Sequence, residues 1–188
     1  MSLSARRVNI ARCIGAIDAS KDISVTAPVV RRLEHEDAEE LKRVLLGLEP
    51  ADRCTRFGAA SSDDFLASHT TSAIADANWT VGAFVGGRLR GVVEVYDSGQ
   101  PGHAEATFVV EREWRRRGLG WALLQSAMRL VADSETRTLR MMFPRHNWPM
   151  RKLAGKAGGR LDMVLGEITV DVAVGTFRAG RAARVASE

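Results

Sequence analysis

The sequence predicts one α/β (α+β) domain, built on a mixed sheet of about seven strands that is flanked by about four helices. Two observations support this. Along the chain, hydrophobic residues recur alternately every second residue, as in strands, and every 3.6 residues, as in helices. With 188 residues, 45% of them hydrophobic, the chain can also bury one substantial core. The predicted order of elements is β, α, α, β, β, β, α, β, α, β, β, which indicates a layered fold.

The first strand is predicted at residues 23–33, which are rich in β-branched side chains. Residues 35–50 follow as an amphipathic helix, because leucines share one face and acidic residues occupy the first turn. The helix is expected to end before Pro50, the last residue of this stretch.

Residues 61–70 predict a second, short helix, capped by Ser61 or Ser62. Residues 78–85 and 88–97 predict two strands, because both are β-branched and apolar. The Gly-Gly pair between them is a strong hairpin signal.

Two helices are expected in the second half of the chain, at residues 118–132 and 147–158. The first has a continuous apolar face, and the second is capped by Asn147 and tolerates a proline in its first turn. The remaining strands are expected at residues 103–111, 137–143, 160–166 and 167–174.

Charge is concentrated at the two ends of the chain. Residues 1–22 hold four basic and two acidic side chains, and residues 176–188 hold three and one. Residues 23–175 therefore hold twenty of each sign, although the sequence pI is about 9.6. A neutral body lacks the broad basic face that nucleic-acid binding requires, so no nucleic-acid partner is expected.

These boundaries divide the chain into an N-terminal arm or leader (1–22), a central domain (23–175) and a basic flexible tail (176–188). The first part is Arg-rich and has no acidic residue before Asp18, which leaves open a targeting peptide, a short amphipathic arm or a frayed leader. The tail (176–188) consists of small and basic residues without a periodic pattern.

The cysteines and the apolar runs bear on the location of the protein. Cys13 and Cys54 lie in unlike contexts without metal-ligand spacing, which predicts free, buried thiols in a reducing compartment. No apolar run approaches the ~18 residues that span a bilayer. The sequence thus favours a cytoplasmic protein without a membrane partner, and the four histidines show no metal-ligand spacing.

Residues 109–124, "VVEREWRRRGLGWALL", place three arginines and two glycines between a predicted strand and a predicted helix. A helix N-terminus has unpaired amides and a positive dipole end, which together bind phosphate. Gly118 and Gly120 allow the backbone to turn and to approach oxygen atoms closely. A solvated turn is the alternative. The sequence contains no P-loop motif, G-x-x-x-x-G-K-[ST]. The dinucleotide-binding motif G-x-G-x-x-G is also missing, because Leu123 stands where its third glycine would be.

Two motifs resemble those of the GNAT superfamily of acyl-CoA N-acyltransferases. "RRRGLG" fits its R/Q-x-x-G-x-G/A signature, and "NWPMRKLAGKAGG" fits its later N-x-x-M-x-x-L-x-x-K-x-G block. The resemblance covers roughly residues 24–173, and the predicted order of elements also matches the family. "LEPADRCTRFG", "AEATFVVEREWRRRGLG" and "NWPM" are most similar to the GNAT domain of bacterial protein lysine acetyltransferases.

The resemblance implies a mostly antiparallel sheet in which acetyl-CoA lies in a V-shaped opening between two parallel strands, residues 103–111 and 137–143. Backbone amides would hold the pantetheine arm and the thioester carbonyl at Phe108, Val109 and Val110. The pyrophosphate would lie on the amides of the loop and first helical turn: Arg115, Arg116, Arg117, Gly118, Leu119, Gly120 and Trp121. Asn147 would contact the far side of the arm.

Glu105 is the expected general base, because it matches the glutamate that the lysine acetyltransferase branch uses. Glu94 is the reserve, since a β-bulge would change which side chain faces the cleft. Many family members supply a tyrosine as general acid where this chain has Ala154. Tyr96 is expected to serve in packing, so no general acid is assigned.

The resulting prediction is an acetyl-CoA-dependent N-acetyltransferase that uses no metal and modifies a primary amine by direct attack. A protein lysine and a small molecule both remain as acceptors, and a noncatalytic acyl-CoA-binding module is the alternative function. A monomer or a homodimer is expected. His35, His69, His103 and His146 are given no catalytic role, and Arg53 and Arg56 are expected to pair with acids such as Glu49.

Overall fold

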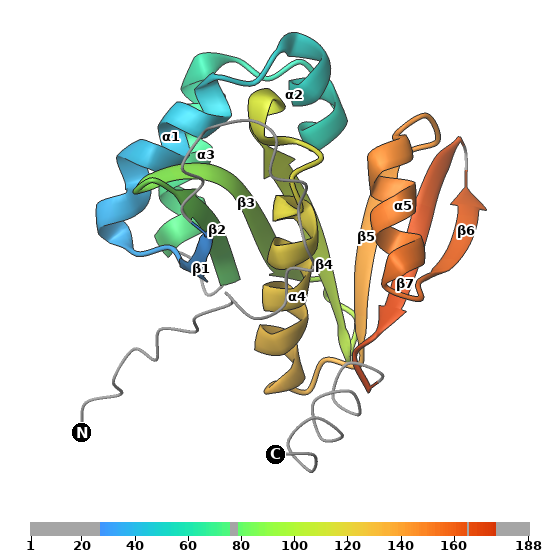
Figure 1. The fold of residues 1–188 in the computed structure, drawn as a ribbon. Helices are drawn as coiled ribbons and strands as arrows, with labels where there is room; N and C mark the ends of the chain where they lie inside the picture. Colours follow the sequence, from blue (N-terminus) through green and yellow to red (C-terminus); the bar gives the residue numbers. More distant parts are fainter. Residues whose placement is uncertain (1–26, 76–78, 165, 176–188) are drawn as a thin grey trace, which may run out of the picture.

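A computed structural model describes residues 27–75, 79–164 and 166–175. They form a seven-stranded sheet in the order β1-β2-β3-β4-β5-β7-β6, which confirms the predicted fold class (Figure 1). The strands are β1 (Val29–Arg32), β2 (Trp79–Val85), β3 (Arg88–Asp97), β4 (His103–Val110), β5 (Thr138–Pro144), β6 (Arg160–Val164) and β7 (Glu167–Ala173). The helices are η1 (His35–Asp37), α1 (Ala38–Leu46), α2 (Pro50–Phe57), α3 (Asp63–Ala75), η2 (Arg112–Trp114), α4 (Leu119–Ala132) and α5 (Trp148–Lys156).

Neighbouring strands of the sheet are antiparallel except for the central pair β4 and β5, which is parallel. The hairpin between β2 and β3 turns at Gly86 and Gly87, whose φ angles of 59° and 78° are both in the left-handed region. A two-residue turn of this kind matches the twist of the flanking strands and needs a positive φ at both residues, which glycine adopts without strain. The hairpin prediction is confirmed.

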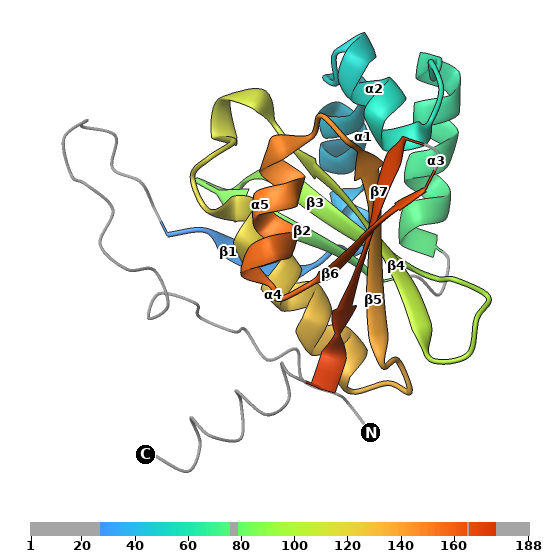
Figure 2. The same cartoon turned by 90° about the vertical axis from the view of Figure 1, so that its right-hand side faces the viewer.

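The sheet has a core on each face, and Figure 2 shows α4 and α5 on one side of it and α3 on the other. Leucines, alanines and a methionine of α4, together with Ala154 of α5, pack against the central strands on the first side. Side chains of α1 and α3, such as Leu41 and Leu66, pack on the second side beneath Val92 and Val109. We call this second side the α3 face.

The first strand is shorter than the predicted range 23–33. Residues 23–26 lie outside the described part of the chain, and β1 begins at Val29. Pro28 precedes it, and proline has no N–H to donate to a neighbouring strand.

Helix α2 was missing from the sequence prediction. Pro50 was expected to follow the end of the first helix, but it is the first residue of α2, with Glu49 as the extended residue before it. Proline suits this place because the first N–H of a helix has no partner within the helix. The next helix, α3, extends to Ala75 and is longer than predicted, and the hydroxyl of Ser62 caps it by accepting from the N–H of Phe65 at 3.2 Å.

Other expectations concern the ends and the cysteines. The predicted N-terminal arm (1–22) and tail (176–188) lie outside the described residues, as does Cys13. Cys54 was predicted to be buried, and this was wrong: it is exposed, because α2 buries none of its residues. Among the described residues, no helix is long and apolar enough to cross a membrane, and no group of three metal-ligating side chains occurs.

Candidate active site

Strands β4 and β5 are paired at one end only. Three residue pairs join them: His103 with Thr138, Ala104 with Leu139 and Glu105 with Arg140. Beyond these pairs the strands continue separately to Val110 and Pro144, and Figure 1 shows them diverging. The V-shaped opening predicted between these two strands is therefore present.

The register shows which amides of β4 face this opening. The N–H of Glu111 donates to the carbonyl of Arg90 at 2.9 Å, and Val109 lies opposite Val92 two residues earlier. In an antiparallel pair only alternate residues bond to the neighbouring strand, so Val109 directs its N–H toward β3. Phe108 and Val110 direct theirs toward the opening. The geometry thus narrows the predicted acyl-binding amides to these two residues.

The loop after β4 leads into the N-terminus of α4, beside the wide end of the opening. Arg116 has a φ of 63° and Gly118, the N-cap residue, a φ of 85°. A positive φ is rare outside glycine and costs on the order of 1 kcal/mol, so its presence at Arg116 marks a constrained backbone. The first helical hydrogen bond runs from the N–H of Ala122 to Gly118, at 3.1 Å. The preceding N–H groups have no acceptor within the helix, which is the arrangement that binds anions.

The three arginine side chains of the loop have different environments. Arg115 is turned inward: its Nε donates to the carbonyl of Val110 at 3.0 Å, and its Nη2 pairs with Asp52 of α2 at 2.6 Å. The guanidinium of Arg117 lies 4.9 Å from the ring centre of Trp114. Arg116 is exposed. Of these three arginines, Arg115 is the one whose side chain forms an ion pair within the described residues.

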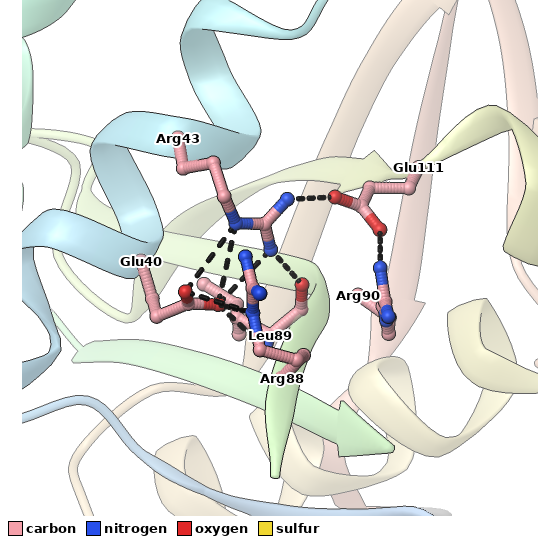
Figure 3. A network of polar contacts seen from close by, with 6 residues as sticks. All are labelled: Glu40, Arg43, Arg88, Leu89, Arg90 and Glu111. Carbon is pink, nitrogen blue, oxygen red and sulfur yellow. Dashed lines mark hydrogen bonds and ion pairs between the residues drawn. The ribbon is translucent and has the colours of Figure 1, made fainter. Parts of the chain in front are cut away.

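A network of ion pairs anchors the start of this loop (Figure 3). Glu111, the residue after β4, binds Arg43 of α1 and, at 2.9 Å, Arg90 of β3. Arg43 also donates to the carbonyl of Leu89 at 2.6 Å and pairs with Glu40 at 3.0 Å. The loop is thus held on one side by α1 and β3, and by α2 on the other.

Glu105, the predicted base, lies at the closed end of the opening. Side chains alternate along a strand, so Glu105 and Thr107 share the α3 face with Val109. The register is regular from β3 to β4, and the irregularity in this part of the sheet falls between Ala83 and Phe84 of β2. No bulge in β4 therefore reverses the side of Glu105, which is half-buried between Tyr96 and Arg140 in the register.

Glu94, the reserve candidate, lies on the same face but in a closed environment. Its side chain is 1% exposed and contacts Arg56 of α2 and His69 of α3, each at 2.8 Å, and Tyr96, whose hydroxyl donates to it. Burial alone would raise the pKa of Glu94, but the hydrogen bond from His69 and the charge of Arg56 outweigh it and lower the pKa to about 2. Glu94 is therefore a structural carboxylate that is ionised at neutral pH.

Two residues of this cluster have partners that the sequence did not identify. Arg56 was expected to pair with an acid such as Glu49, and it does pair with an acid, but the acid is Glu94. Tyr96 was expected to serve in packing, and its hydroxyl also donates to Glu94. Glu49 pairs instead with Arg112. The signal was the stretch "VVEVY": a carboxylate within an apolar strand must find a cation, since an unpaired buried charge is strongly unfavourable. The cation, Arg56, lies on α2, which was not predicted. Burial and the negative charge of Glu94 raise the pKa of Tyr96.

Helix α5 borders the opening on the side of β5. The side chain of Asn147 caps it by accepting from the N–H of Met150 at 3.2 Å, as predicted. Its contact with a pantetheine arm remains a prediction. Ala154, at the tyrosine position of the family, is fully buried in the core. A Cβ placed on Gly120 of α4 would lie 3.9 Å from Leu153, so α4 and α5 face each other here.

Comparisons with known proteins agree with this geometry. A model of the acetyltransferase (GNAT) family matches residues 45–158. No curated protein sequence matches the chain significantly. Among solved structures, the GNAT domain of S. lividans PAT has a TM-score of 0.69 at 20% identity, over 78% of this chain and 90% of that chain. PaiA N-acetyltransferase from Thermoplasma acidophilum, in complex with coenzyme A, has a TM-score of 0.61 at 18% identity, over 79% and 99%. The ribosomal-protein-S18-alanine N-acetyltransferase from Escherichia coli has a TM-score of 0.60 at 14% identity, over 78% and 94%. At these identities the likeness establishes the fold.

Proposed function

The chain belongs to the acetyltransferase (GNAT) family, whose model matches more than half of it, and we propose that it transfers an acetyl group from acetyl-CoA to a primary amine with Glu105 as general base. One observation supports this proposal above all others. The amides of Phe108 and Val110 face the opening between β4 and β5, at the end where the N-terminus of α4 also lies. Donors for a thioester and for a pyrophosphate are thus aligned.

The chemistry follows from these donors. A backbone N–H that meets the thioester oxygen stabilises the oxyanion of the tetrahedral intermediate, an effect worth about 3 kcal/mol per donor in other acyl transfers. The first-turn amides of α4 would hold the pyrophosphate, and the arm would lie between β4 and β5. No metal is needed for this reaction, because amine attack on a thioester requires only a base and an oxyanion donor.

The attacking amine must be neutral, whereas a lysine-type amine is protonated at pH 7. Glu105 can take that proton, directly or through water, because it is half-buried on the α3 face at the last residue that pairs with β5. Glu94 is unsuited to the role, since it is enclosed by Arg56, His69 and Tyr96 and stays ionised.

The leaving thiolate receives its proton from solvent or from the former ammonium group. Ala154 offers no proton, and the hydroxyl of Tyr96 is already donated to Glu94. For the acceptor we propose a protein lysine, which the sequence blocks around "LEPADRCTRFG" and "NWPM" favour, with a small-molecule amine as the second candidate. The similar fold of the S. lividans PAT domain is compatible with either, since it establishes the fold alone.

The proposal is tested by measuring CoA release from acetyl-CoA with a panel of acceptors: lysine peptides, peptides with a free N-terminus and polyamines. Glu105→Gln keeps the size of the side chain and removes its basicity, so kcat should fall by about 10² at neutral pH. The remaining activity should rise toward high pH, where the amine deprotonates unaided. Affinity for CoA should not change, because the pyrophosphate amides lie at the other end of the opening.

Glu135→Gln is the matched control, because Glu135 is exposed in the connection between α4 and β5 and belongs to neither strand that forms the opening. Wild-type turnover by Glu105→Gln across the pH range would contradict the base assignment. If the protein binds acetyl-CoA but acetylates no amine of the panel, it is a noncatalytic acyl-CoA-binding module.

A further inference from the structure

Helix α2 is attached to the rest of the domain mainly through arginines. None of its residues is buried. Arg53 donates to three backbone carbonyls that flank the helix, those of Leu46, Leu48 and Ser61, and pairs with Asp63. Arg56 reaches the buried carboxylate of Glu94. Because these contacts fix both halves of the helix, α2 is a firm support at the side of the active site.

This support extends to the backbone of β4 through the pair of Asp52 and Arg115. The carboxylate of Asp52 binds Nη2 of Arg115 at 2.6 Å, and Nε of the same guanidinium donates to the carbonyl of Val110 at 3.0 Å. One arginine thus connects α2 with the last residue of β4.

The bond to Val110 lies on the side of the opening. In the register with β3, Val110 falls between the residues that bond to that strand, so both its N–H and its carbonyl point the other way, toward β5. There β5 has diverged and no strand fixes these groups. The Arg115 guanidinium takes the place of the missing neighbour strand for this carbonyl.

We propose that Asp52 and Arg115 form a strut that positions the acyl-binding backbone of β4, and that the Arg115 side chain is a positioning group and not a phosphate ligand. The inference rests on the proposed function, because it concerns the amides assigned to the thioester and the arm. Asp52 neutralises the guanidinium, which leaves Arg116 and Arg117 as the cations available to the phosphates.

A matched pair in the same two segments provides the control. Arg112 pairs with Glu49, and Arg115 pairs with Asp52, so each ion pair joins η2 or the loop after it to the start of α2. Arg112 and Glu49 are mostly exposed, and no contact of theirs reaches β4 among the described residues. Arg112→Gln removes one positive charge near the loop without touching the strut.

The experiment compares Arg115→Gln, Asp52→Asn, the double variant, Arg112→Gln and Arg116→Gln. Calorimetry gives Kd for CoA at low and high salt, steady-state kinetics give kcat, and ¹⁵N NMR follows the amides of Phe108 and Val110. A small displacement of acyl-binding groups lowers kcat by about tenfold or more.

We expect Arg115→Gln and Asp52→Asn to lower kcat about tenfold and shift both amide resonances, with Kd for CoA unchanged. The double variant should be no worse than Arg115→Gln alone, because both remove one strut. Arg112→Gln should match the wild type. Arg116→Gln should weaken CoA binding more at low salt than at high salt.

Weaker, salt-dependent CoA binding by Arg115→Gln would show a phosphate ligand and overturn the strut, as would wild-type kcat in Asp52→Asn. If the wild type binds CoA and turns over no amine, the proposed function fails. The NMR spectra of the Phe108 and Val110 amides then test the strut by themselves. Equal shifts in Arg115→Gln and Asp52→Asn, absent from Arg112→Gln, then support the strut, and unmoved resonances overturn it. If CoA does not bind at all, both proposals are wrong.

Discussion

Replacing Glu94 by glutamine should destabilise the protein at neutral pH and have a smaller effect in acid. The side chain is 1% exposed, and Arg56, His69 and Tyr96 all contact its carboxylate. Glutamine keeps the shape but removes the charge, so the buried guanidinium of Arg56 loses its partner. Breaking a buried pair in this way costs about 3 to 5 kcal/mol.

The magnitude follows from the pKa of Glu94, which lies at about 2 in the folded protein against an ordinary value of 4.5. At 1.36 kcal/mol per pKa unit, this difference corresponds to about 3 kcal/mol of stability. Because the folded pKa is the lower one, this stability is present above pH 4.5 and disappears as the pH falls toward 2. By pH 3 about 2 kcal/mol of it is lost.

Urea denaturation of the wild type and of Glu94→Gln at pH 7, 5, 4 and 3 measures this. The gap in free energy of unfolding should be about 3 kcal/mol at pH 7 and about 1 kcal/mol at pH 3. Asp37 and Asp171 also have lowered pKa values, through hydrogen bonds to Arg31 and Arg140, but both proteins contain them and their effects cancel in the difference. A gap that stays constant from pH 7 to pH 3 would refute the reasoning.

Three further predictions concern the fold and the cofactor. Acetyl-CoA should raise Tm in a thermal-shift assay; Gly120→Leu should abolish this rise by filling the space beside Leu153, while Gly120→Ala, whose methyl lies at ordinary contact distance, should keep it. A Cβ at Gly159 would lie 2.3 Å from a β7 side chain, so Gly159→Ala should lower the free energy of unfolding in urea by about 1 to 3 kcal/mol. Gly155 lies in open space within α5, so Gly155→Ala should raise the same free energy by about 0.5 to 1 kcal/mol. A fragment of residues 23–176 should fold and bind acetyl-CoA by calorimetry, because both described core clusters lie within it; an insoluble fragment would contradict this.

The parts of the fold that local chemistry determines were predictable from the sequence. The Gly86-Gly87 turn and the Asn147 cap require those residue types at those places, and both were correctly predicted. Helix α2 was missed because its signal is tertiary. None of its residues is fully buried, only Phe57 among them packs partly against the core, and its arginines contact distant carbonyls and carboxylates. Pro50 was the one local sign, and it has opposite meanings at a helix end and a helix start.

The candidate site divides in the same way. The loop that leads into the N-terminus of α4 was predictable, since glycines before an apolar helical pattern have a local physical meaning, and its binding of an anion stays a prediction. The environment of Glu94 was not, because its partners Arg56 and His69 are separated from it by 38 and 25 positions in the sequence. The role of the Arg115 side chain was also hidden: its partner Asp52 lies on the helix that the sequence did not reveal.

The two glutamates of the α3 face illustrate how environment separates roles. They lie on adjacent strands but not opposite each other, because Glu94 lies opposite Thr107 and Glu105 lies opposite Tyr96. The hydroxyl of Tyr96 donates to Glu94. Hydrogen bonds from His69 and Tyr96 and the charge of Arg56 keep Glu94 ionised despite its burial, which makes it a poor base. Its charge attracts Arg56 and His69 and thereby places α2 and α3 over this face. A carboxylate that serves as base must instead be accessible to the amine near the opening, and half-buried Glu105 is accessible. In the proposed mechanism, the carboxylate that holds α2 and α3 in place is therefore not the carboxylate that takes the proton. This separation would let Glu105 accept a proton while the contacts of Glu94 stay intact.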